Sequence, residues 1–200
     1  MRLLSLYLLL LLLGFSSCQQ KSLSIPDYIN WVKSAESNMS VSKKIGDYSF
    51  TLQYLPIKYR ALQEVDNLQS VTKNQLDSIT DIYKNQEFFI LRISNANETK
   101  NMLKTNLFSH EEYQERVQYF SFGLQSDLSL ITTELLACTT IHFERSYGLS
   151  PYDTFLISFP STLEKTDKQF VYNDRILGTG PVKFTITKEN IDNIPKLILE

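Results

Sequence analysis

Histidine and cysteine are scarce in this sequence, which holds two of each among its 200 residues. Hydrolytic zinc sites usually take three protein ligands, and histidine dominates among them. The sequence has no His-Glu-x-x-His motif, no paired Cys-x-x-Cys motif and no Gly-x-Ser-x-Gly motif. These motifs mark zinc proteases, structural zinc or redox sites, and serine hydrolases, respectively. We therefore expect a protein that is not an enzyme and that needs no metal or cofactor.

A strong excess of charge of either sign is also missing. The chain has 20 Lys and Arg residues against 22 Asp and Glu residues, for a formal net charge of −2. No block of basic residues occurs, and binding to nucleic acid depends on many Lys and Arg contacts with phosphates. The composition therefore argues against a nucleic-acid partner. Hydrophobic residues at 42% and aromatic residues at 12% are typical of a chain with a packed core.

A long apolar run occurs only at the N-terminus. Arg2 precedes a leucine-rich run over residues 3–13, which is shorter than the roughly 20 residues of a membrane-spanning helix. Its length fits the apolar region of a secretory signal peptide. We expect residues 1–17 to be this signal peptide, which makes Cys18 the first residue of the mature chain.

The motif Phe15-Ser16-Ser17-Cys18 resembles the lipobox of bacterial lipoproteins, although Phe15 stands where leucine is usual. The resemblance implies diacylation of the Cys18 sulfur, cleavage before Cys18 and acylation of the new amine. Several acyl chains, each contributing about 0.8 kcal/mol per buried CH₂, make a lasting anchor in a lipid bilayer. The alternative is an ordinary secretory signal peptide that places Cys18 beside the cleavage site by coincidence.

The residues that follow Cys18 bear on localisation. Gln19 stands where an aspartate would, by analogy with enteric lipoproteins, imply retention in the inner membrane. Residues 20–22 lack the acidic pair associated with surface export in Bacteroidetes. The resemblance therefore implies the outer membrane, with the domain on its periplasmic face. If Cys18 carries lipid, Cys138 is the only thiol left, so no intramolecular disulfide stabilises the fold.

The remaining chain has the patterns of both strands and helices. Residues 41–45 and 48–54 flank Gly46-Asp47, which predicts a hairpin with a two-residue turn. Residues 87–94 are apolar on both faces around Phe88–Leu91, which predicts the central, buried strand of a sheet. Helical spacing and capping residues predict the helices. The predicted helices cover residues 27–36, 56–67, 72–83 and 109–123, and the other predicted strands cover 135–145, 154–159, 170–173 and 182–187.

These patterns predict an α+β fold with a mainly antiparallel sheet and three to four helices packed on it. Residues 18–24 would be the lipidated cysteine and a short tether, and residues 25–200 a single globular domain. We expect the tail, residues 191–199, to be an edge strand or a strap. Phe108 and Tyr113 are placed to pack together around the start of the last helix as a hydrophobic staple.

As a whole, the mature chain resembles uncharacterised small lipoproteins of Bacteroidetes. The stretches that carry this resemblance are Trp31-Val32, Tyr54-Leu55-Pro56 and residues 142–148. The resemblance implies a place in the cell envelope and supplies no chemistry.

The stretch with the most chemically varied side chains is residues 138–145, inside a predicted strand. Side chains alternate along a strand, so Cys138, His142 and Glu144 would share one face and Arg145 the other. His142 and Glu144 would lie about 7 Å apart, close enough for their tips to meet on one ion. The plainer interpretation is a core cysteine, a hydrogen-bonded histidine and a pair between Glu144 and Arg145.

One further site is suggested by a short motif. Asp77-Ser78-Ile79 resembles the Asp-Ser/Thr-aliphatic acceptor of O-glycosylation in Bacteroidetes, with Ser78 as the acceptor. The motif lies inside a predicted helix, so the alternative is an ordinary exposed helix face.

Three functions remain open at the level of the sequence. The first is a non-catalytic, membrane-anchored envelope lipoprotein that binds another protein or takes part in an assembly. The second is a periplasmic immunity or inhibitor lipoprotein that blocks a toxin, which would need an exposed, acidic docking face. The third is a hydrolase or a metal-dependent enzyme centred on His142 and Glu144.

Overall fold

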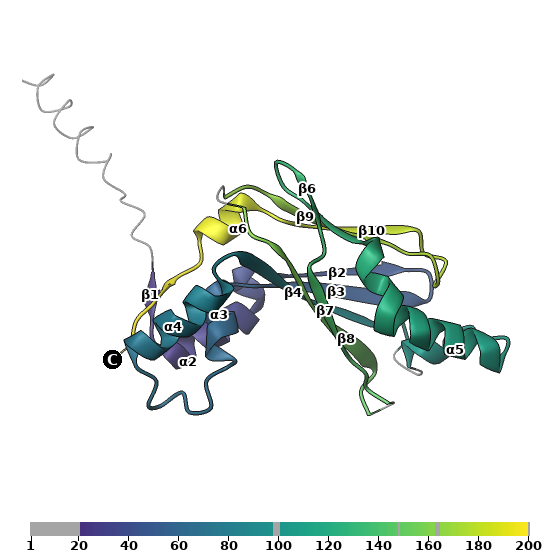
Figure 1. Cartoon of the computed structure of the whole chain (residues 1–200), viewed down its shortest axis with the longest axis horizontal. Helices are drawn as coiled ribbons and strands as arrows, with labels where there is room; N and C mark the ends of the chain where they lie inside the picture. Colours follow the sequence, from purple (N-terminus) through teal and green to yellow (C-terminus); the bar gives the residue numbers. More distant parts are fainter. Residues whose placement is uncertain (1–20, 98–100, 148, 163–164, 200) are drawn as a thin grey trace, which may run out of the picture.

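The structure is a computed structural model that describes residues 21–97, 101–147, 149–162 and 165–199. Two antiparallel sheets form its centre, with strand orders β2-β3-β4-β8-β7 and β10-β9-β5-β6. Helices α2, α3 and α4 gather at one end of the molecule and α5 lies at the other (Figure 1). The predicted α+β fold with mainly antiparallel pairing is confirmed. The strands of the first sheet are β2 (Ser40–Ile45), β3 (Tyr48–Leu55), β4 (Gln86–Asn95), β8 (Tyr152–Pro160) and β7 (Thr140–Glu144), and those of the second are β10 (Pro181–Ile186), β9 (Lys168–Asn173), β5 (Leu128–Ile131) and β6 (Leu135–Ala137).

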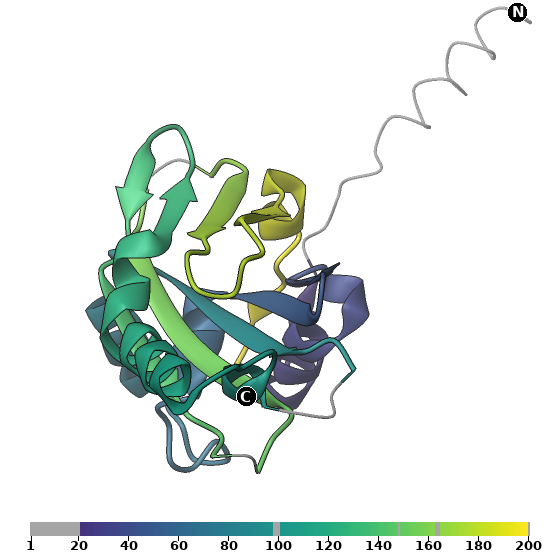
Figure 2. The same cartoon turned by 90° about the vertical axis from the view of Figure 1, so that its right-hand side faces the viewer.

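The two sheets bury their facing sides against each other in one aromatic-rich core, and Figure 2 looks toward this arrangement from the α5 end. The inner face of the five-stranded sheet contributes Phe50, Phe89 and Phe155, none of which is exposed to solvent. The four-stranded sheet contributes Phe170 and other apolar residues of β5, β9 and β10. Tilted and edge-on ring contacts, with centroids 5.6 Å apart for Phe89 and Phe170, connect the two layers.

The first hairpin follows the prediction closely. Strands β2 and β3 pair from Ser40–Gln53 to Ile45–Tyr48, leaving Gly46 and Asp47 as the two-residue loop. Gly46 has a φ of +56°, the left-handed conformation that this turn needs and that glycine adopts without steric cost.

Strand β4 is the central strand of its sheet, as predicted, with β3 on one side and β8 on the other. One expectation for this strand is wrong. Ile90 does not lie in the fully buried core, because it points to the outer face, where the helices cover the sheet only in part. Its neighbours Phe89 and Leu91 point inward and are fully buried.

The helices start close to where the sequence places them, and two predicted capping bonds are present. Thr72 Oγ1 accepts a hydrogen bond from Gln75 N, and Ser109 Oγ accepts one from Glu112 N. The predicted staple is wrong, because the side chain of Phe108 is 91% exposed. The helices are α2 (Ile25–Lys33), α3 (Ile57–Leu62), α4 (Lys73–Tyr83), α5 (His110–Gln118) and α6 (Lys188–Asp192).

Two segments differ from the predicted helix and strand boundaries. Helix α3 ends at Leu62 rather than near residue 67, and Asn67 Oδ1 then accepts a hydrogen bond from Gln69 N in a local turn that competes with helix. The start of the tail is helical in α6, where Thr187 Oγ1 caps Asn190 N. The short strand β11 (Lys196–Leu197) follows.

The two ends of the described chain lie together. Strand β1 (Ser22–Leu23) pairs in parallel with β11, and the backbone hydrogen bonds Lys196 N to Lys21 O and Ile198 N to Leu23 O extend this pairing. The folded structure therefore includes residues that the sequence analysis assigned to the tether.

A buried ion pair also connects the two sheets. Lys168 Nζ on β9 lies 2.9 Å from Glu87 Oε1 on β4, and the two side chains are only 3% and 9% exposed. Tyr54 and Ser161 donate hydrogen bonds to the same carboxylate. Each buried charge thus depends on the other, since an ionised group without a partner in a core is costly.

We expect Lys168→Met to lower the free energy of unfolding by about 3–5 kcal/mol, because it leaves the Glu87 carboxylate buried without a cation. The double variant Glu87→Gln/Lys168→Met should regain part of that loss, because a neutral amide still accepts the bond from Tyr54. Urea unfolding of the wild type, both single variants and the double variant measures the coupling. Strictly additive losses would contradict the dependence of one charge on the other.

Candidate interaction surface around α5

The predicted strand over residues 135–145 is in fact two strands in different sheets. Strand β6 pairs with β5, whereas β7 pairs with β8. The chain crosses between the sheets at Cys138 and Thr139, where Gln125 Nε2 donates hydrogen bonds to both carbonyl oxygens. Because this side chain supplies hydrogen bonds to carbonyl oxygens where the pairing between strands is interrupted, the chain can leave one sheet there and enter the other.

His142 and Glu144 share one face of β7, as predicted, and both are exposed. Among the described residues, no group of three His, Cys, Asp or Glu side chains is placed to hold a metal ion. Glu144 does not pair with Arg145, so that part of the plainer interpretation is wrong. The two residues point to opposite faces, as consecutive positions along a strand do.

Cys138 is a buried thiol rather than an exposed nucleophile. Its side chain is 8% exposed, and Sγ donates a hydrogen bond to the carbonyl oxygen of Thr140. Burial raises the pKa of the thiol to about 12. The thiol is therefore protonated near neutral pH and is a poor nucleophile.

Arg145 contacts two tyrosine rings beside α5. Its guanidinium carbon is 5.8 Å from the ring centroid of Tyr113, on α5, and 4.8 Å from that of Tyr147. Nη2 also donates a hydrogen bond to the hydroxyl of Tyr113. A guanidinium over aromatic faces is a favourable arrangement, worth about 0.5–1 kcal/mol at an exposed site. These contacts hold the chain after β7 against α5.

Large apolar side chains are exposed next to α5 and in the segment after Arg145. A hollow of about 310 Å³ is bordered by Tyr113, Val117, Phe122 and Arg145, among others. The exposed fractions are 91% for Phe108, 84% for Phe122, 77% for Tyr147 and 95% for Leu149. We call these four residues, with Tyr113 and Arg145, the α5 surface.

The segment after α5 explains why Phe122 points outward. Residues Tyr119–Gly123 continue the helix with π-helical geometry, and Leu124–Asp127 follow as a 3₁₀ turn. The wider turn directs Phe120 into the core, fully buried, while Phe122 faces solvent. Gly123 is the last residue of the π-helical segment and keeps a right-handed helical conformation, so the chain runs directly into the 3₁₀ turn.

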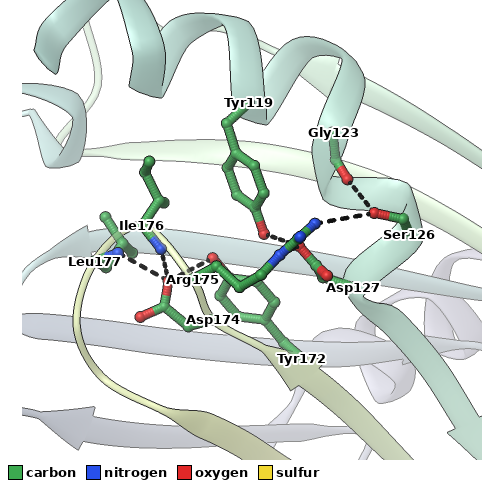
Figure 3. A network of polar contacts seen from close by, with 9 residues as sticks. All are labelled: Tyr119, Gly123, Ser126, Asp127, Tyr172, Asp174, Arg175, Ile176 and Leu177. Carbon is green, nitrogen blue, oxygen red and sulfur yellow. Dashed lines mark hydrogen bonds and ion pairs between the residues drawn. The ribbon is translucent and has the colours of Figure 1, made fainter.

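A polar network fixes this segment to the β9–β10 hairpin (Figure 3). Asp127 accepts hydrogen bonds from the hydroxyl of Tyr119, at 2.7 Å, and from Arg175 Nε, also at 2.7 Å. Arg175 Nη2 reaches Ser126 Oγ, which in turn donates to the carbonyl oxygen of Gly123. Burial and the contact with Asp127 raise the pKa of Tyr119, so its hydroxyl stays a donor near neutral pH.

The second carboxylate of the network, Asp174, organises the loop between β9 and β10. It accepts backbone N–H bonds from Ile176, Leu177 and Thr179, and its Oδ1 accepts the hydroxyl of Tyr172. Burial alone would raise the pKa of this carboxyl, but the backbone donors outweigh burial and hold the pKa below its usual value. Asp174 therefore holds the loop in its ionised form.

We expect Asp174→Asn to lower the free energy of unfolding by about 1–3 kcal/mol near pH 7, because the amide NH₂ would face backbone donors. The pKa of Asp174 is lower in the folded than in the unfolded protein. Its ionised carboxylate therefore stabilises the fold above the unfolded pKa of about 3.9, and this stabilisation is lost as pH falls through the folded pKa. The difference between wild type and variant should therefore shrink below pH 4. Urea unfolding at a series of pH values checks this, and a pH-independent difference would contradict it.

Two predicted modification sites remain, Ser78 and Cys18. Ser78 is exposed on α4, where its Oγ donates to the carbonyl oxygen of Asn74, so the hydroxyl is in a helical environment. Glycosylation of Ser78 stays a prediction. Cys18 lies outside the described residues.

Comparison with known proteins does not assign the chain to a family. No family model matches the chain, and neither a curated protein nor a solved structure is detectably similar to it. Within the described part of the chain, no helix is both long and apolar enough to cross a membrane.

Sequence reasoning found Arg145 but missed the residues that surround it. Tyr113 and Phe122 lie within the predicted helix over residues 109–123, and Tyr147 lies beyond the predicted strand over residues 135–145. A signal was present, because a helix whose sequence is His-Glu-Glu-Tyr-Gln-Glu-Arg-Val-Gln has few apolar residues to bury. Large aromatic residues just outside such a helix are candidates for exposure.

Proposed function

We propose that this chain is a non-catalytic, membrane-anchored lipoprotein of the bacterial cell envelope that binds another protein through the α5 surface. The observation that carries the proposal is the exposure of Phe108 and Phe122 on either side of α5 and of Tyr147 and Leu149 just after Arg145. Aromatic residues and arginine are enriched in protein interfaces and among the residues that dominate binding energy.

Single exposed apolar residues are ordinary on protein surfaces, but a group of them is not. Phe108, Phe122 and Leu149 are each more than four-fifths exposed. Complete burial of such a side chain against a partner stabilises a complex by about 1.5–3 kcal/mol. Arg145 is already held in place by Tyr113 and Tyr147, so it loses little conformational freedom on binding.

The proposed anchor supports this use of the α5 surface. Three residues lie between Cys18 and Ser22, and the four steps along the chain (22 − 18) span at most about 14 Å when it is extended. Ser22 belongs to β1, which lies at the α2–α4 end of the molecule (Figure 1). A lipid on Cys18 would hold this end near the bilayer and leave α5, at the far end, directed away from it.

A specific observation also keeps the inhibitor function as a second candidate. Glu111 and Glu115 are both exposed on α5, four residues apart and therefore on one side of the helix. They give the edge of the α5 surface a negative charge, as an inhibitor of a basic toxin domain would need. No comparable observation favours the enzyme centred on His142 and Glu144.

We expect a photo-reactive benzoylphenylalanine at position 122 to cross-link one defined protein in intact cells. The matched control is the same residue at Ile82 of α4, which is 70% exposed but lies at the opposite end of the molecule. Position 82 should not yield the same product. Equal products from both positions, or none from position 122, would count against the α5 surface.

Once the cross-linked partner is known, Tyr147→Ala should weaken binding by about 2 kcal/mol, since it removes one of the two rings that contact Arg145. The free energy of unfolding should fall by no more than about 1 kcal/mol, which is the worth of the lost contact with Arg145. Titration calorimetry and urea unfolding separate the two effects.

The anchor has its own test. Cys18→Ser should abolish incorporation of a fatty-acid analogue and leave an unprocessed precursor, because the thiol that would accept the lipid is missing. Cys138→Ser is the matched control and should be labelled like the wild type. Equal labelling of Cys18→Ser and the wild type would rule out the anchor without affecting the case for the α5 surface.

A further inference from the structure

The outer face of the five-stranded sheet is covered by helices over only one end. Leu55 and Phe88, neighbours on β3 and β4, are buried beneath α2, α3 and α4. Farther along the same face, polar side chains such as Thr51, Arg92 and Thr154 follow in register across the strands. The helices thus end part-way along the sheet.

A groove of about 490 Å³ lies where the helices end. Its walls include Arg60 and Gln63 from the end of α3, and its floor includes residues from β4, β8 and β7. Volumes of this size are typical of small-molecule sites. The groove is on the opposite face of the sheet from the π-helical segment that continues α5, because that segment packs against the inner face through Phe120.

Two of the four charged groups in the groove neutralise each other. Arg60 forms an ion pair with Glu64, one helical turn away, and its guanidinium also lies over the rings of Tyr83 and Phe88. Arg60 is therefore held in place and balanced by a neighbouring carboxylate.

The other two charges have no such balance. Arg92 lies over the ring of Tyr152, but neither its guanidinium nor the Glu144 carboxylate forms a hydrogen bond or ion pair with any other described residue. The register sets Arg92 beside Thr154, and Thr154 beside Glu144. The backbones of Arg92 and Glu144 are therefore two strand spacings apart, about 9.6 Å. One positive and one negative group thus face the same groove with a hydroxyl between them.

The next row of the sheet is apolar on β4 and β8 and continues to His142 on β7. Ile90 pairs with Leu156 across β4 and β8, directly beside the row of Arg92 and Thr154. Both residues border the groove and both are only partly buried. Their exposed parts form an apolar floor between the charged row and the helices.

We propose that this groove binds a small zwitterion of the amino-acid class with an apolar side chain. Arg92 takes the carboxylate, Glu144 takes the ammonium, and the side chain lies over Ile90 and Leu156. The hydroxyl of Thr154 lies between the two charged groups and accepts from the ammonium or donates to the carboxylate.

The balance of charges selects this class over its alternatives. A simple anion on Arg92 would lie near the Glu144 carboxylate, and a simple cation on Glu144 would lie near the Arg92 guanidinium. A ligand that carries both charges on one small scaffold satisfies both groups at once. The proposal concerns a different face from the α5 surface and depends on neither the anchor nor the protein partner.

Calorimetric titration of the full chain, purified in detergent, with L-leucine tests the proposal. N-acetyl-L-leucine lacks the ammonium, and L-leucinamide lacks the carboxylate. Each should bind roughly ten- to a hundredfold more weakly than leucine, since each loses one charge-assisted contact. Arg92→Gln and Glu144→Gln should each weaken leucine binding to the same extent. The matched control is His142→Gln, on the same face of β7 but outside the groove, which should bind leucine like the wild type.

Several results would overturn the assignment. No heat of binding with leucine at millimolar concentration would show that the groove is not such a site. Equal binding of N-acetyl-L-leucine would show an anion site, and equal binding of L-leucinamide a cation site. Loss of binding in His142→Gln, or unchanged binding in Arg92→Gln, would place the ligand elsewhere.

Discussion

The strict alternation of side chains across the five-stranded sheet is the constraint on which the rest of the molecule depends. Odd-numbered positions of β4 and β8, such as Phe89 and Phe155, point inward and build the core with the second sheet. Even-numbered positions, such as Phe88 and Arg92, point outward, where they are covered by helices at one end and open at the other. One sheet therefore supplies a core on one face and a groove on the other, and the chain needs no disulfide to hold them together.

The local parts of this arrangement could be predicted from the sequence. The Gly46-Asp47 hairpin and the caps at Thr72 and Ser109 follow from contacts within a few residues of each other. The buried strand β4 follows from its run of apolar residues. In each case, short-range chemistry and the hydrophobic pattern agree, which is the condition under which such predictions succeed.

The parts that could not be predicted depend on long-range contacts. The break between β6 and β7 depends on Gln125, 13 residues before Cys138, whose side chain satisfies the backbone there. Arg145 was expected to pair with its neighbour Glu144, but the strand turns them to opposite faces, and Tyr113 of α5 takes the arginine instead. Ile90 appeared to be a core residue because the apolar pattern of β4 does not reveal where the covering helices end.

The network around Asp127 and Asp174 gives the α5 surface a rigid base. Tyr119 and Arg175 converge on Asp127 from the helical segment and from the loop after β9, so one carboxylate joins elements 48 residues apart. A rigid support reduces the conformational entropy that an exposed surface loses on binding. The surface can therefore present Phe122 to a partner without first becoming ordered.

The α5 surface and the groove meet at one point in the chain, because Arg145 directly follows Glu144. Coupling between two sites requires an element with two arrangements that both ligands can bias. Strand β7 offers little scope for a second arrangement. All five of its residues pair in register with β8, and the ring of Phe143 stacks on that of Phe155 with centroids 4.6 Å apart. A slip by one residue would turn Phe143 into solvent and Glu144 into the core. The same alternation that separates the two residues thus fixes the strand between them, so we expect binding at the α5 surface and binding in the groove to be independent of each other.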